Sequence, residues 1–306
     1  MAEGPQVPPA TRCGFVAILG APNAGKSTLL NRLVGAKVSI VTPKVQTTRR
    51  RVLGILVEGH AQIIFVDTPG IFTPRRRMER AMVRAAWQGA EDADLVLLVV
   101  DAAKPRLGDD TRRILDGLKQ AGRHAFLVLN KIDAVKREKL LGLAKTLFEE
   151  GVFDEVFMVS AENGDGVGDL LKALIARLPE GPWHYPGDQL SDLPVRELAA
   201  EITREKLFLQ LRAELPYALM VETETWEEFA DGSVRVGQVI YVERESQRAI
   251  VLGEGGRMIK AVRLAATQDI ASLAGRPVHL FLHVKQRENW QEDPERYRAM
   301  GLDYES

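Results

Sequence analysis

The sequence predicts an α/β domain with a mostly parallel sheet wrapped by helices, followed by a small α+β domain. Its 306 residues suit two compact domains better than a single core. Up to about residue 178, short apolar runs alternate with segments of helical periodicity. A stretch rich in Pro and Gly at residues 179–188 ends this alternation, and the elements beyond it follow a different order.

The expected strands of the first domain are continuous apolar runs, which is the pattern of strands buried on both faces. Between them, apolar residues recur at spacings of three and four, and this predicts helices. The apolar runs lie at residues 15–19, 63–66, 95–100, 126–129 and 156–159, and the helical segments lie at 78–87, 111–118, 139–148 and 169–178.

The second domain is expected to begin with a long amphipathic helix at residues 195–214. Strands at 218–229 and 234–243 flank the turn Asp231-Gly232, which predicts an antiparallel hairpin. A Gly-rich turn at 253–256, a helix to about residue 273 and a strand at 278–284 follow. The predicted segments are a flexible N-terminus at 1–12, the first domain at 13–178, a linker at 179–194, the second domain at 195–287, and a tail at 288–306 with a short helix at 294–300.

Composition excludes several classes of protein. With 45% hydrophobic and 27% charged residues, the chain resembles an average globular protein and not a disordered one. The sequence has no run of 18 apolar residues, and its Pro-rich start lacks a signal-peptide pattern, so we expect a cytoplasmic protein. The single cysteine, Cys13, fits a structural role in a reducing compartment. A net charge of −1 means that any polyanion must meet a local basic patch.

The segment after the first expected strand has the pattern of a phosphate-binding P-loop. Its glycines let backbone N–H groups surround phosphates, and the N-terminus of the next helix favours their negative charge. Lys26 supplies a point charge, and Ser27 is expected to ligate Mg²⁺. The nucleotide-binding residues predicted here are Gly20, Ala21, Pro22, Asn23, Ala24, Gly25, Lys26, Ser27 and Thr28.

A second motif, Asp67-Thr68-Pro69-Gly70, lies at the carboxyl end of the strand at 63–66. A carboxylate there can reach the metal, and the Gly70 N–H can meet a γ-phosphate. A loop that contacts only the triphosphate form acts as a switch. All four residues are predicted to bind the nucleotide, with Asp67 also at the metal.

A third motif, which holds Asn130, Lys131 and Asp133, predicts that the base is guanine. Guanine offers two neighbouring N–H donors that the Asp133 carboxylate accepts as a fork, whereas adenine offers no such pair. This argues against the main alternative enzyme, a P-loop kinase or ATPase. The tripeptide after the next strand is expected to give a backbone N–H to the guanine oxygen; its residues are Ser160, Ala161 and Glu162.

The polar segment between the P-loop and Asp67 contains Thr47 and Thr48, one of which should complete the Mg²⁺ shell. With this segment, five motifs in order resemble the translation-factor-type GTPases of the Era, EngA and TrmE group. The resemblance implies that the Thr-Thr-Arg segment is switch I. We predict Thr48 as the metal ligand, with Thr47 as the alternative, and the basic run at 49–51 as the solvated start of a strand.

The reaction expected of this site is in-line attack of water on the γ-phosphorus, helped by positioning and charge stabilisation. Ile71 stands where Ras-like proteins place a water-orienting glutamine, so either another group orients the water or turnover is slow. Asn23 resembles the asparagine with which some related GTPases hold K⁺, which predicts stimulation by K⁺; the alternative is that Asn23 satisfies backbone groups of the loop. The predicted catalytic residues are Lys26, Asn23, Thr48 and Gly70.

In the second domain, a Gly-x-x-Gly turn resembles the one with which KH domains clamp backbone nucleotides. The order helix, strand, strand, turn, helix, strand resembles the prokaryotic type of KH fold. Acidic residues outnumber basic ones from residue 196 onward, but Arg257, Lys260 and Arg263 make this segment basic, so attraction should be local and salt-sensitive. The predicted RNA-binding residues are Gly253, Glu254, Gly255, Gly256, Arg257, Met258 and Lys260.

A GTPase domain followed by such a KH domain is the layout of the Era GTPases, and the resemblance extends from residue 15 to about residue 304. It implies GTP or GDP as ligand, Mg²⁺ and K⁺ as ions, and binding to small-subunit (16S) ribosomal RNA near its 3′ end. It also implies a role in 30S subunit assembly, a monomeric state and peripheral association with the inner face of the cell membrane. A nucleotide-gated membrane scaffold is the remaining alternative, but it would need a basic amphipathic helix, and the sequence shows no convincing one.

Three other patterns carry no site. His279 and His283 are about 13 Å apart on an expected strand at ~3.3 Å per residue, so they cannot share a metal ion. The four tryptophans form no row in the sequence, which favours core or linker packing over base contacts. The arginines at 75–77 are expected on the solvated surface of switch II, with contact to RNA or membrane phosphates as the alternative.

Overall fold

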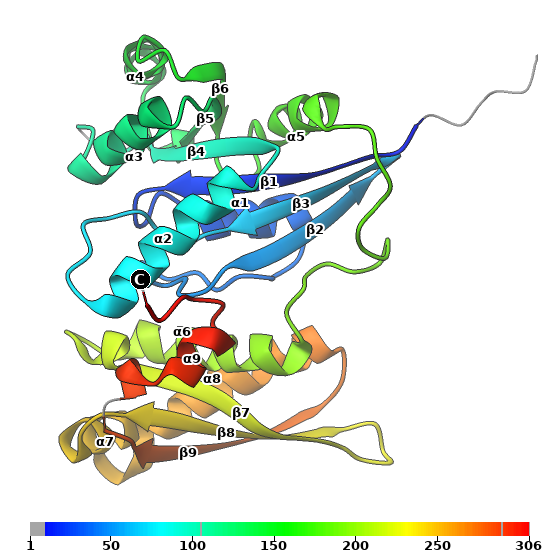
Figure 1. Cartoon of the computed structure of the whole chain (residues 1–306). Coiled ribbons are helices and arrows are strands. Elements are labelled where there is room, and N and C mark those ends of the chain that lie inside the picture. Colours follow the sequence, from blue (N-terminus) through cyan, green and yellow to red (C-terminus); the bar gives the residue numbers. More distant parts are fainter. Residues whose placement is uncertain (1–9, 105, 289, 306) are drawn as a thin grey trace, which may run out of the picture.

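The computed structural model describes residues 10–104, 106–288 and 290–305, which form two domains stacked on each other (Figure 1). The first domain, uppermost in Figure 1, ends with helix α5 (Val167–Arg177), and the second begins with helix α6 (Val195–Gln210). The C-terminal tail leaves the second domain and packs against helix α2 (Arg77–Glu91) of the first.

A six-stranded sheet in the order β2-β3-β1-β4-β5-β6 forms the centre of the first domain. All neighbouring pairs are parallel except β2 and β3, so the predicted mostly parallel sheet is confirmed. The strands are β1 (Arg12–Gly20), β2 (Val52–Glu58), β3 (Ala61–Asp67), β4 (Leu95–Asp101), β5 (Ala125–Asn130) and β6 (Phe153–Val159).

Strand β2 lies outside the predicted apolar runs because Gly54 interrupts its apolar residues. The fold needs a glycine at this point, since a Cβ on residue 54 would lie 2.5 Å from Cδ1 of Leu30. Strand β1 begins at Arg12, the last residue of the segment expected to be flexible. Thr11 of that segment forms two hydrogen bonds with Gly181, each of 2.9 Å, and residues 1–9 lie outside the described residues.

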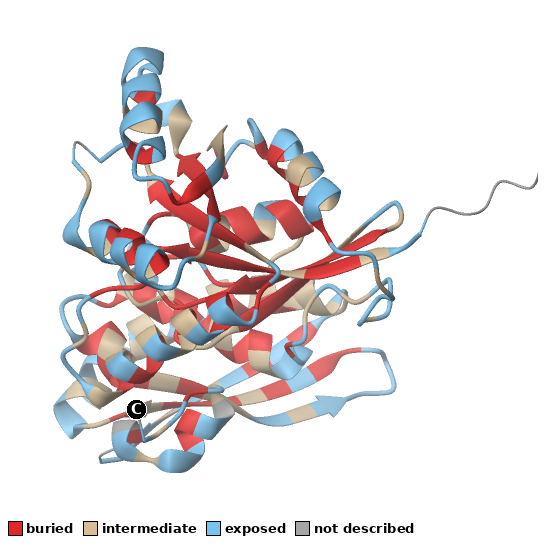
Figure 2. Cartoon of the chain, turned by 45° about the horizontal axis from the view of Figure 1, so that its top comes forward, coloured by how far each residue is buried: buried red, intermediate tan, exposed pale blue. Residues whose placement is uncertain are grey.

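Alternate strand residues face two separate cores, one on each side of the sheet. Val16 and Ile18 pack with helices α1 (Lys26–Val34) and α5, whereas Ala17 and Leu19 pack on the side of α2, α3 (Asp109–Gln120) and α4 (Arg137–Phe148). Figure 2 shows the buried strands between helices whose outer faces are exposed. This arrangement places the carboxyl ends of the parallel strands, where the predicted motifs lie, along one edge of the domain.

The second domain is a three-stranded sheet in the order β7-β8-β9, covered on one face by helices. Strands β7 and β8 form the predicted antiparallel hairpin, and β9 runs parallel to β8. The elements after α6 are β7 (Leu219–Glu228), β8 (Val234–Val242), α7 (Glu245–Leu252), α8 (Arg257–Ala274), β9 (Val278–Gln286) and α9 (Pro294–Ala299).

Two details of the second domain differ from the prediction. Helix α6 ends at Gln210 rather than near residue 214, and the chain continues into a short 3-10 turn, η2 (Leu215–Ala218). The Gly-x-x-Gly turn follows helix α7, not a strand, so it joins two helices. Helix α7 escapes prediction because it has only eight residues, too few for a clear helical period.

The segment between the domains follows the open edge of the first sheet. The backbone N–H of Ile55 in β2 donates to the carbonyl oxygen of Leu190 at 2.9 Å, and Ser191 forms a bridge with Gly54. This segment therefore covers part of β2 although it contains no long regular element. Within the described residues, each helix is too short or too polar to cross a membrane.

Candidate functional site

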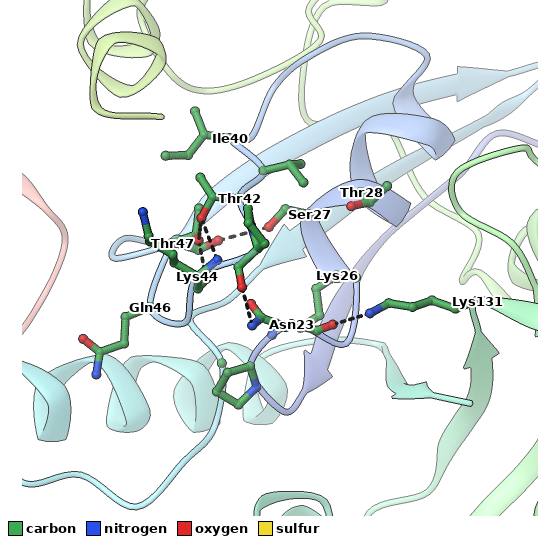
Figure 3. Close-up of a pocket in the computed structure, with 16 residues that line it drawn as sticks. Asn23, Lys26, Ser27, Thr28, Ile40, Thr42, Lys44, Gln46, Thr47 and Lys131 are labelled. Atoms are coloured by element: carbon green, nitrogen blue, oxygen red, sulfur yellow. Dashed lines mark hydrogen bonds between the residues drawn. The ribbon is translucent and has the colours of Figure 1, made fainter. Parts of the chain in front are cut away.

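The loop between β1 and α1 borders a cavity of about 250 Å³ (Figure 3). Gly25 has φ +95°, and a Cβ at this position would lie 2.2 Å from Nδ2 of Asn130, so only glycine fits. The loop after β3 approaches the same cavity, since a Cβ on Gly70 would lie 3.1 Å from the backbone nitrogen of Pro22. From the predicted set, the cavity is lined by Pro22, Asn23, Gly25, Lys26, Ser27, Thr28, Thr48, Gly70 and Lys131.

Lys26 is buried at the start of α1, and its Nζ donates to the carbonyl oxygens of Gly20 and Ala21 at 3.1 and 3.3 Å. Burial lowers the pKa of Lys26 to about 8, and the Asp67 carboxylate opposes this shift only in part. Two carbonyl groups are weak partners for a buried ammonium group. The side chain is therefore suited to exchange them for phosphate oxygens.

Three oxygen-bearing side chains from separate segments converge beside this lysine. The Ser27 hydroxyl lies 2.7 Å from Oδ2 of Asp67 and 3.0 Å from Oγ1 of Thr48. Asp67 is fully buried, and its Oδ1 has no hydrogen-bond partner in the part of the chain that the structure describes. Burial raises the pKa of the Asp67 carboxyl, against the influence of Lys26 and the neighbouring hydroxyls.

This donor set fits Mg²⁺. Mg²⁺ prefers hard oxygen ligands and is bound by one or two carboxylates together with phosphate oxygens and water. The carboxylate of Asp67, which has one oxygen without a partner and lies next to the hydroxyls of Ser27, Ser39 and Thr48 and to the phosphate loop, provides such a place. No group of three or more His, Cys, Asp or Glu side chains suited to a metal occurs among the described residues, so this is not a site of the zinc type.

The two threonines of switch I have different surroundings. Thr48 is buried and its hydroxyl faces Ser27 and Asp67, whereas the hydroxyl of Thr47 contacts Oγ1 of Thr42 at 2.7 Å and the carbonyl oxygen of Lys44 at 2.8 Å. Thr48 is thus the threonine that the fold brings to the candidate metal site.

The motif after β3 does not present all four of its residues to the cavity. The Thr68 hydroxyl donates to the carbonyl oxygen of Ile18 at 2.9 Å, and Thr68 is fully buried, so this side chain holds the loop to β1. Gly70 is the member that reaches the P-loop. Ile71 is fully buried in the core below the sheet and cannot orient a water molecule. Its backbone N–H donates to the carbonyl oxygen of Gly20.

The base-reading motif links three loops. The Asn130 side chain donates to the carbonyl oxygen of Ala24 at 2.9 Å and accepts from the Ala161 N–H at 3.0 Å. Lys131 donates to the carbonyl oxygen of Asn23 and to Asp101. Asp133 is exposed, and its carboxylate has no partner among the described residues, which leaves it free to accept the two N–H groups of a guanine.

In the tripeptide after β6, two of the three backbone N–H groups that were predicted to be available to the guanine oxygen already donate to other groups. The Ser160 N–H donates to the carbonyl oxygen of Asp165, and the Ala161 N–H donates to Asn130. Of the three, the Glu162 N–H is the one for which the described part of the chain shows no acceptor. A guanine oxygen would therefore meet Glu162, or Ala161 after a movement of Asn130.

Asn23 connects the P-loop with switch I. Its side-chain amide donates to the carbonyl oxygen of Pro43 at 2.8 Å, and its φ of 63° is unusual for a residue other than glycine. Asn23 thus satisfies a backbone carbonyl group, as the alternative to K⁺ binding expects, but this group belongs to switch I and not to the P-loop itself. It also places an amide and a backbone carbonyl together at the rim of the nucleotide cavity.

The Gly-x-x-Gly turn projects from the second domain. Gly253 has φ +70° and a Cβ there would lie 2.7 Å from the Cβ of Met258, whereas a Cβ on Gly255 would meet open space. Glu254 and Arg257 form an exposed ion pair at 3.4 Å. Met258 differs from the other predicted RNA contacts, because its half-buried side chain packs against the core of the domain.

The basic run at 49–51 was expected on a solvated surface, and this is wrong for Arg49, which is only 6% exposed. Its guanidinium donates to the backbone carbonyl oxygens of Leu219, Pro216 and Tyr217 at 2.8 to 3.1 Å. Arg50 pairs with Glu197 of α6. Sequence reasoning missed these contacts because the partners are about 150 to 170 residues away; the run of three arginines was the only signal.

Two family models match the chain. One is described as a 50S ribosome-binding GTPase and matches residues 15–131, and the other is described as a KH domain and matches residues 214–291. The chain is 62% identical to "GTPase Era" of Sinorhizobium medicae (strain WSM419) over 295 residues, which are 96% of this chain and 94% of the relative.

Two solved structures resemble the whole chain. One is a crystal structure of Era in complex with MgGDPNP and nucleotides 1506–1542 of 16S ribosomal RNA, and the other is an Aquifex aeolicus Era variant bound to GDP·AlF₄⁻. Each has 37% sequence identity and a TM-score of 0.89, and each match covers 95% of this chain and 99% of the other.

Proposed function

This chain belongs to the Era family of GTPases, and from that premise we propose that it binds small-subunit (16S) ribosomal RNA near its 3′ end and acts in 30S subunit assembly. In this proposal GTP hydrolysis in the first domain controls RNA binding by the second. A similar structure that carries both a GTP analogue and 16S ribosomal RNA supports the choice of the small subunit.

One observation carries the proposal for the first domain. Ser27, Thr48 and the partnerless Oδ1 of Asp67 meet beside the buried ammonium group of Lys26. A metal-bound triphosphate supplies what each group lacks: a cation for the carboxylate oxygen and anionic oxygens for Lys26.

The roles of the residues in hydrolysis follow from their positions. We assign the phosphates to the P-loop N–H groups and Lys26, and the metal to Ser27, Thr48 and Asp67. When bound, Mg²⁺ neutralises charge on the β- and γ-phosphate oxygens. We assign the Gly70 N–H to the γ-phosphate and Asp133 to the guanine base. Because Ile71 cannot hold the attacking water, we expect slow turnover unless another group is added.

K⁺ is part of this proposal. A K⁺ ion held by the side-chain oxygen of Asn23 and a switch I carbonyl such as that of Pro43 would place positive charge next to the phosphates. Replacement of K⁺ by Na⁺ in a hydrolysis assay is then expected to lower the rate in the wild type and to have little effect in Asn23→Ala.

For the second domain, we assign RNA binding to the exposed turn and the start of α8. Gly255 leaves space for a nucleotide backbone, and the exposed side chains of Arg257 and Lys260 supply charge. We do not assign a base contact to Met258, because it packs inward.

The test is binding of a labelled RNA with the sequence of the 16S 3′ end to the full chain loaded with a GTP analogue. Gly255→Asp adds a negative charge where the phosphates are expected, so it should weaken binding strongly and leave GTP hydrolysis intact. Gly232→Asp is the matched control, because Gly232 also has positive φ with open space around it but lies in the distant hairpin. Equal RNA affinities of the two variants would contradict the assignment.

Cytoplasmic localisation, a monomeric state and peripheral contact with the inner face of the membrane complete the proposal and rest on the family alone. Sedimentation with vesicles of anionic lipid, and the mass in solution with and without GTP analogue, test the last two. A chain that stays in the supernatant at low salt would refute the membrane contact.

A further inference from the structure

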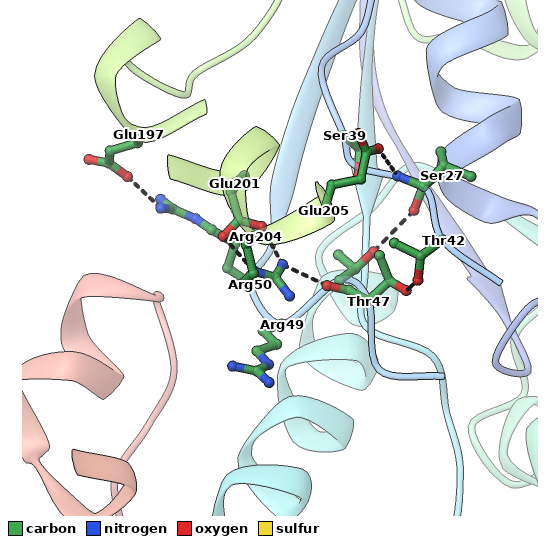
Figure 4. A network of polar contacts seen from close by, with 12 residues as sticks. Ser27, Ser39, Thr42, Thr47, Arg49, Arg50, Glu197, Glu201, Arg204 and Glu205 are labelled. Atoms are coloured by element: carbon green, nitrogen blue, oxygen red, sulfur yellow. Dashed lines mark hydrogen bonds and ion pairs between the residues drawn. The ribbon is translucent and has the colours of Figure 1, made fainter. Parts of the chain in front are cut away.

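Switch I is held from one side by a helix of the other domain. Several hydrogen bonds join the segment 37–49 to α6 and to the turn that follows it, and three of them involve the neighbouring α6 residues Arg204 and Glu205 (Figure 4). Together with Glu201 and Phe208, these residues lie at helical spacings of three and four, so they form one face of α6.

Arg204 forms a hydrogen bond with the backbone of Thr47, the residue before the candidate metal ligand Thr48. Its Nη2 donates to the carbonyl oxygen of Thr47 at 2.7 Å, and Glu201 holds the same guanidinium through Nε at 3.0 Å and through Nη2. The side chain of Arg204 is 3% exposed. Because the peptide group that joins Thr47 to Thr48 is planar, this hydrogen bond helps to fix the position of the Thr48 Cα, from which the hydroxyl reaches the candidate metal site.

Glu205 holds the other end of switch I. Its Oε1 accepts the backbone N–H of Val41 at 2.9 Å, and its Oε2 lies 2.6 Å from Nζ of Lys37. A buried carboxylate that accepts a backbone N–H makes a strong, directional contact. Lys44, between these two points, donates to the carbonyl oxygen of Leu211 at the end of α6 at 2.6 Å.

The opposite face of α6 belongs to the core of the second domain. Leu207 packs in the same cluster as Val251 of α7 and Val262 of α8, the two helices that flank the Gly-x-x-Gly turn. One rigid helix therefore touches switch I on one side and the supports of the RNA-binding turn on the other.

We propose that Arg204 and Glu205 are positioning residues for GTP hydrolysis: they hold the backbone of switch I so that the Thr48 hydroxyl reaches the metal site, although they belong to the RNA-binding domain. This inference rests on the proposed GTPase mechanism and adds to it residues that no nucleotide motif contains. The G domain alone lacks them, so without the second domain the backbone of its switch I loses these supports.

The test uses single-turnover GTP hydrolysis by the full chain over a range of Mg²⁺ concentrations. Arg204→Met keeps the bulk of the side chain but removes its donors. We expect the rate of this variant to be about 10-fold lower than that of the wild type, or lower still. It should also need more Mg²⁺ to reach its half-maximal rate. GDP affinity should stay unchanged, because GDP binding does not require Thr48 at the metal. Arg212→Ala is the matched control, since Arg212 is an exposed arginine just beyond α6.

Two further variants separate positioning from general packing. If Arg204 acts through Thr48, then Arg204→Met should add no loss to Thr48→Ala, and the double variant should be as fast as Thr48→Ala. Arg204→Lys can reach the Thr47 carbonyl but cannot hold Glu201 as well, so its rate should be intermediate.

Several outcomes would overturn the inference. One is a hydrolysis rate of Arg204→Met equal to that of Arg212→Ala. Another is a double variant of Arg204→Met and Thr48→Ala whose loss of rate equals the product of the two single losses. If Arg204→Met fails to bind GDP, the Arg204→Lys variant is the test instead. A wild-type hydrolysis rate with wild-type Mg²⁺ dependence in Arg204→Lys would then overturn the inference. A wild type without GTP hydrolysis would refute the proposed function together with this inference, whereas hydrolysis insensitive to Arg204 refutes the inference alone.

Discussion

Arg49 donates a hydrogen bond through Nη1 to the backbone carbonyl oxygen of Leu219, 2.8 Å away and in the other domain. Arg49 follows the candidate metal ligand Thr48, and Leu219 is the first residue of β7 in the RNA-binding domain. Burial lowers the pKa of Arg49 to about 9, with nearby Arg204 as a second cause. The guanidinium also lies over the rings of Phe208 and Trp290, at 5.6 and 6.0 Å from their centroids. The residue next to the candidate metal ligand is thus held in a buried polar contact with the RNA-binding domain.

Thr48→Ala should slow Mg²⁺-dependent GTP hydrolysis by about 10-fold or more, because it removes an oxygen that lies 3.0 Å from Ser27 in the metal site. Thr47→Ala should have a smaller effect, since its hydroxyl bonds only within switch I. Hydrolysis rates measured across Mg²⁺ concentrations distinguish the two. A larger loss in Thr47→Ala would show that the neighbouring threonine is the ligand.

Asp133→Asn should reduce affinity for GDP by about 100-fold or more, because the fork of two N–H groups loses its charged acceptor. The same variant should gain affinity for xanthosine diphosphate, whose 2-oxo group can accept from the new amide. Fluorescence titration with both nucleotides checks this. Asp116→Asn, on the exposed side of α3, makes the same charge change and should alter neither affinity. Unchanged GDP binding in Asp133→Asn would exclude this residue from the base site.

Nucleotide binding should depend on pH through Lys26. Its pKa in the free protein is about 8, and phosphates should raise it on binding. A group whose pKa rises on binding favours the complex fully below the free pKa, and this contribution is lost as pH rises through 8 towards the bound pKa. Calorimetry at pH 8.5 in buffers of different ionisation enthalpy should therefore show proton uptake with GDP. Binding without proton exchange, at constant affinity from pH 7 to about 9.5, would be inconsistent with this assignment.

Tyr297→Phe should stabilise the protein or leave its stability unchanged. The tyrosine is fully buried where the C-terminal tail packs against α2, and its hydroxyl has no hydrogen-bond partner among the described residues. Burial raises the pKa of Tyr297 to about 12. Removal of an unsatisfied buried hydroxyl should raise the free energy of unfolding by about 1 kcal/mol. Urea unfolding measures it, with Tyr304→Phe as a half-exposed control; a clear loss of stability would reveal a partner for the hydroxyl.

The nucleotide motifs could be predicted because the residues of each motif are neighbours in the sequence. Their function depends on the local course of the backbone and not on contacts with distant segments. Gly25 and Lys26 act where the chain turns from β1 into α1, and the order of strand, loop and helix is visible in the sequence. The fold class followed from the same local signals: continuous apolar strands and helical periods.

Contacts between distant segments could not be predicted. Arg49 looks like part of an exposed basic run until Leu219 is brought beside it. Thr68 reads as a nucleotide contact, but its hydroxyl holds the loop to Ile18. Met258 lies in the right segment for RNA, yet its position on the first turn of α8 directs it into the core. In each case the packing of another element decides the role.

The most direct test of coupling between the domains compares RNA affinity in two nucleotide states. Labelled RNA of the 16S 3′ end is titrated with the full chain bound to a GTP analogue or to GDP. In the described structure Thr48 lies at the candidate metal site and space surrounds Gly255, so we predict binding about fivefold tighter or more with the analogue. Arg49→Met should abolish the difference and preserve GDP affinity. Equal RNA affinity of the wild type in both states would contradict the coupling.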